Sequence, residues 1–277
     1  MTPNPDEIGV GATGELSLRV SVATLVRVLF KNPNDDELML ALERKATLRR
    51  TAEGGAVRVK SQPFGGAIRI FDLRTVHGLV DGFHFDSERS RAEQDFRIFI
   101  RPSSWSTLRE FCLQHIVLDD DLILETSPSR ELVEEFAETL GVDLRPEQYV
   151  SQPITTIVEN RVISTENIYS PGTSTVRLYR IYEAAITDLF LPHAILRHGN
   201  DLSHQRLCEL AIADAQDGGK GKANSVLTLP WERLLSVYRA MVPAERNIPI
   251  VFEGNRLDST VAAILEEIAV PRYQSVW

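Results

Sequence analysis

One short amphipathic helix is indicated by the segment Ser127-Pro128-Ser129-Arg130-Glu131-Leu132-Val133-Glu134-Glu135-Phe136-Ala137-Glu138-Thr139-Leu140-Gly141. Ser127 is a good N-cap, Pro128 suits the first helical position, and Gly141 is a typical stop. Apolar side chains recur along one face (Leu132, Val133, Phe136 and Leu140). Glutamates recur on the other side at i, i+3, i+4 and i+7 (Glu131, Glu134, Glu135 and Glu138). Because like charges at this spacing repel, such a face either points into water or holds a divalent cation.

The glutamate face has two interpretations. A solvated face is the commoner outcome, and carboxylates in a first turn are also favoured by the helix dipole. Arg130 favours the second interpretation, since an arginine directly before the carboxylates can orient one of them. Mg²⁺ prefers a few carboxylates together with phosphate oxygens and water.

The start of this helix resembles the core of the Nudix box, whose pattern is Arg-Glu-apolar-any-Glu-Glu; the residues here are Arg130-Glu131-Leu132-Val133-Glu134-Glu135. The Nudix box is the motif of hydrolases that cleave nucleoside diphosphates linked to another group. The upstream order is similar too. Residues 25–30 and 37–42 are expected to form strands around a turn at 32–36. Pro63-Phe64-Gly65-Gly66 then resembles the Pro-Gly-Gly that opens the family's box.

The resemblance implies a Mg²⁺- or Mn²⁺-dependent hydrolase that acts on a nucleotide-type small molecule. It assigns Glu131, Glu134 and Glu135 as metal ligands and Arg130 as the residue that orients Glu131. Gly65 and Gly66 would let the backbone approach the pyrophosphate. The family also leads us to expect a homodimer and a further carboxylate from a later strand or loop, for which the candidates are Glu159, Glu166 and Glu183.

The chain departs from the family pattern at several positions. Arg130 follows Gly66 by 64 positions, so an ordered insert at 67–124 interrupts the box. A strand at 96–100 and a helix at 104–115 are expected inside the insert. Glu125 lies closer to Arg130 than the early glutamate of the box does, and Ala137 replaces a glycine. A comparable insertion occurs in Nudix-like proteins of bacterial nucleotide-signalling defence systems.

These departures support an alternative function. The chain would then be a catalytically inactive Nudix-like module that binds a nucleotide or a partner protein, as a sensor or accessory subunit, with antiphage defence as one setting. A third hypothesis is a structural interaction protein in which the glutamates are merely solvated.

The basic residues between Glu43 and Lys60 suggest a loop just before Gly65-Gly66. Guanidinium groups bind phosphate bidentately, so Arg44, Arg49 and Arg50 are candidate substrate-binding residues. A solvated loop that offsets acidic neighbours is an equally good interpretation.

Composition sets the remaining expectations. Of 277 residues, 43% are hydrophobic and 25% charged, which is typical of a globular protein. The net charge of −9 argues against a general nucleic-acid binder. No apolar run approaches the roughly 20 residues that span a bilayer, so no membrane partner is expected. Cys112 and Cys208 show no metal-binding spacing and fit a reducing compartment, which makes the cytoplasm the expected location.

The predicted fold is α/β (α+β) and Nudix-like, with a mixed sheet sandwiched between helices. Residues 1–14 are expected to be a flexible tail and 15–277 a single domain. Strands are expected at 155–164 and 176–186, joined by a long turn at 167–175. The C-terminal region 188–277 is expected to be helical, with helices at 204–215, 230–241 and 259–268.

Overall fold

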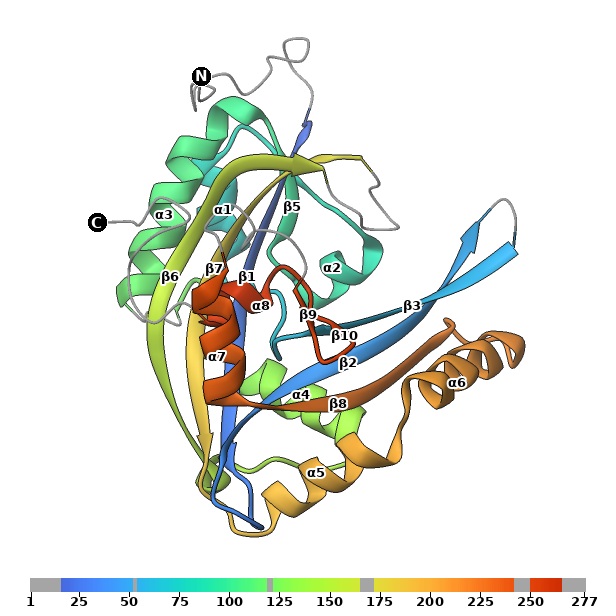
Figure 1. The fold of residues 1–277 in the computed structure, drawn as a ribbon. Coiled ribbons are helices and arrows are strands. Elements are labelled where there is room, and N and C mark those ends of the chain that lie inside the picture. The colour runs from blue at the N-terminus through green and yellow to red at the C-terminus, as the bar shows by residue number, and fades with distance from the viewer. Residues whose placement is uncertain (1–15, 52–53, 119–121, 165–171, 242–249, 266–277) are drawn as a thin grey trace.

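The computed structural model describes residues 16–51, 54–118, 122–164, 172–241 and 250–265. They form an α+β fold around one eight-stranded mixed sheet (Figure 1). The strands are β1 (Leu18–Lys31), β2 (Leu38–Thr51), β3 (Gly54–Gln62), β4 (His84–Phe85), β5 (Arg97–Ile100), β6 (Tyr149–Ser164), β7 (Ser174–Ile186) and β8 (Lys222–Pro230). A small hairpin of β9 (Val251–Phe252) and β10 (Asn255–Arg256) forms a separate two-stranded sheet beside β3.

The helices are α1 (Leu73–Leu79), α2 (Glu88–Glu93), α3 (Trp105–Leu118), α4 (Ser129–Leu140), α5 (Leu191–Asp201), α6 (His204–Gln216), α7 (Trp231–Ala240) and α8 (Val261–Leu265). None of the helices in the described ranges is long and apolar enough to cross a membrane.

Strand β1 is the centre of the sheet, and nearly all of its side chains are buried. Along one edge it pairs in parallel with β7, from Arg19 opposite Thr175 to Leu29 opposite Ala185. Two other strands, β5 and β2, share the opposite edge of β1. β5 pairs with the first part and β2 with the last part, both antiparallel. Between them, single bridges join Ala23 to Ala67 and Val26 to Phe64, so the glycine turn lies against the middle of β1.

Two apolar cores lie on the same face of β1, because side chains that alternate along a strand share a face. The first, the α3 core, packs α3 on the start of β1 (Leu18, Val20, Val22, Leu108, Cys112, Val176 and Leu178). The second, the α4 core, packs α4 on the end of β1 (Val26, Val28, Phe30, Phe64, Leu132, Phe136 and Tyr182). On the opposite face, α7 and α8 cover Leu25, Leu29 and Ile181. The sheet is therefore sandwiched between helices, as expected.

The strand and the helix expected inside the insert are present as β5 and α3. β5 continues the main sheet by pairing with β1, and α3 supplies the apolar face of the α3 core. The insert is therefore part of the central sheet and its core.

Two expectations about secondary structure are wrong. The basic segment from Glu43 to Lys60 is no loop, because β2 and β3 form a long hairpin there. The C-terminal region is not wholly helical, since β8 adds a strand to the edge of β2. The alternation in Ser225-Val226-Leu227-Thr228-Leu229 explains that strand, because β-branched and apolar residues favour a half-buried sheet position.

The expected helices at 204–215 and 230–241 are confirmed as α6 and α7, and the strands at 155–164 and 176–186 as β6 and β7. The tail at 1–14 and most of the turn at 167–175 lie outside the described residues. The third helix is described only as α8, and the residues after 265 lie outside the description.

Candidate functional site

Helix α4 begins and ends near its predicted limits. It starts at Ser129 with Pro128 as the capping residue, one position later than Ser127 alone predicts. The hydroxyl of Ser127 still accepts a hydrogen bond from the Ser129 N–H (3.2 Å). Gly141 ends the helix with φ 64°, in the left-handed region that glycine favours. The local sequence signals therefore position this helix closely.

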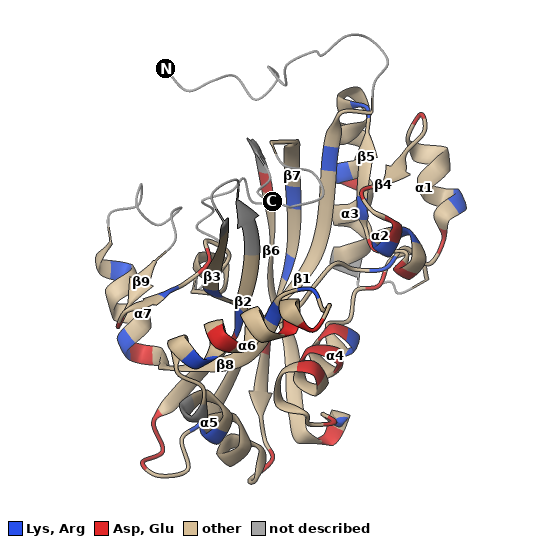
Figure 2. Ribbon diagram, turned by 90° about the vertical axis from the view of Figure 1, so that its right-hand side faces the viewer, with Lys and Arg blue, Asp and Glu red and all other residues tan. Residues whose placement is uncertain are grey.

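The glutamate face of α4 is divided by the fold. Glu131 and Glu135 turn toward the protein, whereas Glu134 and Glu138 are exposed. Figure 2 shows the acidic positions on successive turns of α4. Residues at i and i+4 share a helix face, so Glu131 and Glu135 form a buried pair beside the exposed ones.

The glycine turn lies directly against this buried pair. Gly65 has φ 119°, and a Cβ there would collide with the carbonyl oxygen of Thr24. Its N–H donates a hydrogen bond to Oε2 of Glu135 (2.6 Å). At Gly66 a Cβ would collide with the carboxylate of Glu131. The two glycines therefore meet the helix despite the long insert.

Arg130 links the carboxylates of the site. Its guanidinium donates to both oxygens of Glu125 (2.8 and 2.6 Å) and to the carbonyl of Ala67 (3.1 Å). Its Nη1 lies 2.6 Å from Oε1 of Glu131 and 3.1 Å from Oε2 of Glu134. These contacts offset part of the negative charge of three carboxylates and also fix α4 to the segment that follows the glycine turn.

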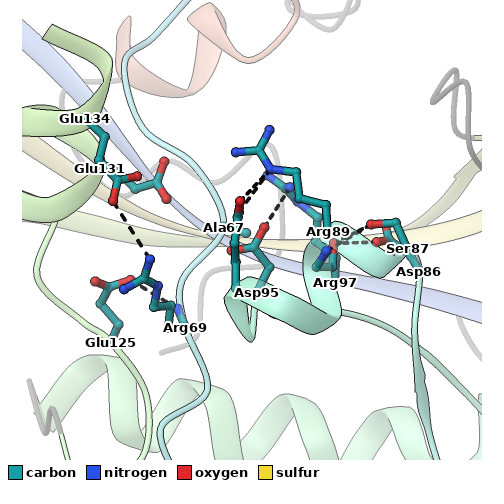
Figure 3. Close-up of polar contacts among 12 residues, drawn as sticks. Ala67, Arg69, Asp86, Ser87, Arg89, Asp95, Arg97, Glu125, Glu131 and Glu134 are labelled. Carbon is teal, nitrogen blue, oxygen red and sulfur yellow. Dashed lines mark hydrogen bonds and ion pairs between the residues drawn. The ribbon is translucent and has the colours of Figure 1, made fainter. Parts of the chain in front are cut away.

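Glu125 is the residue that holds Arg130, although its spacing differs from that of the family box. Besides the guanidinium, its Oε2 accepts the Arg69 N–H (3.1 Å), and its own N–H donates to the Arg69 carbonyl (2.9 Å). Figure 3 shows Glu125, Glu131 and Glu134 gathered at the segment that carries Ala67 and Arg69. The shorter spacing is accommodated because Glu125 is tied to this segment before α4 begins.

Arg69 and Asp95 are further charged residues beside the site. Nη2 of Arg69 lies 3.9 Å from Oε1 of Glu134, and its buried Nε has no hydrogen-bond partner within the described residues. Asp95 comes from the insert and pairs with Arg97 (3.0 Å), and its charge acts on Glu131. No motif marked either residue, because their position depends on the pairing of Arg69 with Asp95 between distant segments.

Strand β2 adds two residues that the sequence interpretation missed. Nζ of Lys45 lies 2.5 Å from Oε2 of Glu43 and 3.5 Å from Oε1 of Glu135. Gln62 of β3 also donates to Glu43 (3.2 Å). The signal was the position of these residues directly after the apolar strand residues 38–42, because a strand that continues through them places Glu43 and Lys45 on one face.

Burial and neighbouring charges alter the acidities at this site. Desolvation raises the pKa of Glu135 well above its usual value, and the charge of Glu43 adds to the effect. Desolvation also raises the pKa of Glu131, although Arg130 opposes it. Burial alone would lower the pKa of Lys45, but Glu43 and Glu135 outweigh it and raise that pKa. The pKa of Arg130 is raised too, because its carboxylate partners outweigh its desolvation.

Of the three predicted phosphate-binding arginines, the structure places the side chain of Arg44 alone, and it does not bring that side chain to the site. Arg44 lies on the face of β2 opposite Glu43 and Lys45, where it donates to Ser225 Oγ (2.9 Å) and to the carbonyl of Leu202. It is buried, and desolvation lowers its pKa. Arg49 and Arg50 belong to β2, but their side chains lie outside the described residues.

Of the later carboxylates, Glu159 and Glu183 do not complete the site. Glu183 pairs with Arg27 (2.6 Å) and Glu159 with Arg177 (3.7 Å), both on the sheet face opposite α4. Glu166 lies outside the described residues. Among the described residues, Glu43 is instead the carboxylate that β strands bring next to Glu135.

The donor set suits a hard divalent cation, although its atoms are not gathered around one point. Among the described residues, no group of three or more His, Cys, Asp or Glu side chains is arranged to hold a metal ion. The cations of Arg130 and Lys45 lie among these carboxylates instead. Carboxylate oxygens are the ligands that Mg²⁺ and Mn²⁺ prefer, and Oε1 of Glu43 is buried with no hydrogen-bond partner in the part of the chain that the structure describes. The type of ligand present is therefore the one that such an ion prefers, but the described side chains do not form an assembled ligand set.

Comparison of the chain with protein-family models, curated proteins and solved structures found no match.

Proposed function

We propose that this chain is a Nudix-type, Mg²⁺- or Mn²⁺-dependent hydrolase of a nucleoside diphosphate linked to another moiety. The observation that carries the proposal is the contact between the Gly65 N–H and Glu135, with Gly66 against Glu131. A glycine turn beside buried carboxylates lets a diphosphate approach the backbone and a cation together.

The residues of the site have separate roles in this proposal. Glu131, Glu134 and Glu135 hold the ion, and Arg130 keeps Glu131 in place while Glu125 anchors Arg130. The ion supplies Lewis-acid neutralisation of the diphosphate and activation of a water for attack. Arg69, beside the exposed Glu134, offers guanidinium donors to a phosphate. Few other groups are needed, because positioning and charge neutralisation dominate phosphoryl chemistry.

Metal binding is the first test of this proposal. Calorimetry with Mg²⁺ or Mn²⁺ would compare the wild type with the Glu134→Gln/Glu135→Gln double variant, in which we expect affinity to fall at least about tenfold. Glu138→Gln is the matched control, because Glu138 is exposed on the same helix. Equal affinities for all three proteins would contradict the metal site and favour solvated glutamates.

Turnover is the second test. The protein would be incubated with Mg²⁺ and a panel of ADP-ribose, NAD, dinucleoside polyphosphates and nucleoside triphosphates. Hydrolysis of one of them, lost in the Glu134→Gln/Glu135→Gln variant, is expected for the hydrolase.

A second candidate function is a non-catalytic nucleotide-binding or protein-interaction module. The observation that favours it is that Arg130 and Lys45 already form ion pairs with the carboxylates. Binding of metal or nucleotide without turnover of the panel would support this candidate. The homodimer and the cytoplasmic location stay predictions, and sedimentation velocity would test the former.

A further inference from the structure

Glu43 is the most deeply buried carboxylate beside the glycine turn. Its exposed fraction is 1%, and its Oε1 has no hydrogen-bond partner among the described residues. Burial of a carboxylate is costly unless every oxygen is paired. Only Oε2 of Glu43 meets that requirement, through Lys45 and Gln62. Oε1 of Glu43 is therefore a buried hydrogen-bond acceptor that no donor among the described residues reaches.

Lys45 places its ammonium group between two acids from different elements. Nζ contacts Glu43 on β2 itself and Glu135 on α4, and Glu135 in turn holds the Gly65 N–H. An ammonium group donates three hydrogen bonds and carries a single charge. A divalent ion at the same place would neutralise both acids, but it cannot coexist with the ammonium at close range because like charges repel.

We propose that Glu43 is a further ligand of the metal site and that the Lys45 ammonium occupies the position that the divalent cation takes between Glu43 and Glu135. This inference rests on the proposed function, because it concerns the same metal. Lys45 acts as a built-in competitor whose side chain must leave before the ion binds. Its side chain is 30% exposed, so it has a route to solvent that Glu43 lacks.

If the Lys45 ammonium competes with the divalent ion, removal of its positive charge should raise the affinity of the protein for Mn²⁺. Lys45→Gln keeps a hydrogen-bond donor near both acids but removes the charge. We expect Mn²⁺ to bind Lys45→Gln about tenfold more tightly than the wild type, as measured by calorimetry or by the loss of the free Mn²⁺ electron paramagnetic resonance signal. Lys60→Met is the matched control, since Lys60 lies opposite Lys45 on β3 but pairs with Asp258 (3.0 Å). Its Mn²⁺ affinity should equal that of the wild type.

Glu43→Gln tests the ligand itself. If Glu43 binds the ion, Lys45→Gln/Glu43→Gln should bind Mn²⁺ at least about tenfold more weakly than Lys45→Gln alone. Should Lys45→Gln fold poorly, Glu43→Gln alone is compared with the wild type, and we expect it to bind Mn²⁺ more weakly. Equal affinity of the two variants would overturn the role of Glu43, because its carboxylate would then be irrelevant to the metal.

The outcomes separate this inference from the proposed function. Mn²⁺ binding by the wild type with no gain in Lys45→Gln overturns the competition and leaves the hydrolase standing. Binding by Lys45→Gln alone supports the competition and counts against a hydrolase in the native chain. Absence of Mn²⁺ binding in every protein overturns both.

Discussion

Helices α3 and α4 cover the same face of the sheet, but they differ in the polarity of the side chains that they turn inward. α3 presents Leu108, Cys112 and Ile116 to the start of β1, and this part of the core is apolar. α4 presents Leu132 and Phe136 to the end of β1, but it also turns two glutamates inward against the glycine turn.

The difference between the two helices shows that buried carboxylates require partners, whereas buried apolar side chains do not. The α3 core is stabilised by removal of apolar surface from water alone. The buried acids around α4 are tolerated because Arg130, Lys45 and a backbone N–H meet them. Buried carboxylates contribute little to stability even when they are paired, and this asymmetry is why we place the proposed site at α4.

The largest effect is expected from removal of the central cation. Arg130→Met leaves Glu125 and Glu131 buried without their partner, and this should lower the free energy of unfolding by about 3–5 kcal/mol in urea denaturation. Arg89→Met on α2 is the control, because its pair with Glu93 is exposed and contributes at most about 1 kcal/mol. Equal losses in both variants would show that Arg130 does not hold the site together.

A core truncation in α3 should affect stability without affecting the site. Leu108 is fully buried, so Leu108→Ala should lower the free energy of unfolding by about 2–5 kcal/mol. The Mn²⁺ affinity of the folded variant, measured by calorimetry, should equal that of the wild type. A large change in metal affinity would remove the distinction between the two helices.

An added methyl group at the glycine turn should disturb the acids directly. Gly66→Ala places a Cβ onto the carboxylate of Glu131, and we expect a loss of about 1–3 kcal/mol together with weaker Mn²⁺ binding. Gly78→Ala in α1 is the control, because nothing lies within 4 Å of its Cβ position. That change should be neutral or stabilise by up to about 1 kcal/mol. Similar results for the two glycines would mean that Glu131 moves aside freely.

The pH dependence of stability should show the smallest effect. Since the pKa of Glu135 is raised in the folded state above its ordinary value of 4.5, the folded protein binds the proton more tightly than the unfolded chain does. This contribution to stability is full below pH 4.5 and is lost as pH rises through the folded pKa.

Glu135→Gln cannot titrate, so its stability should fall less than that of the wild type as pH rises from 4.5. The two slopes should differ by at most about 1.4 kcal/mol per pH unit, measured by urea unfolding across this range. Parallel curves for the two proteins would contradict a raised pKa at this position.

Much of the fold around the site follows from local sequence. The cap, the apolar stripe and Gly141 predict α4 to within one residue at its start, and the Val, Ile, Thr and Tyr content predicts β6 and β7. The hairpin of β2 and β3 was missed because its many arginines and lysines resemble a solvated loop. In the structure, Arg44 is instead buried against Ser225 and Leu202.

The sequence by itself determined that a helix would carry Glu131 and Glu135 and that glycines would turn at positions 65 and 66, since capping, periodicity and glycine preference act over a few residues. Only the tertiary structure decided that these two segments meet, that Glu125 holds Arg130, and that Glu43 and Lys45 face Glu135. The reason is physical: contacts between distant segments depend on strand pairing and on which face each strand buries. One shift of register would send every side chain of β2 to the other face.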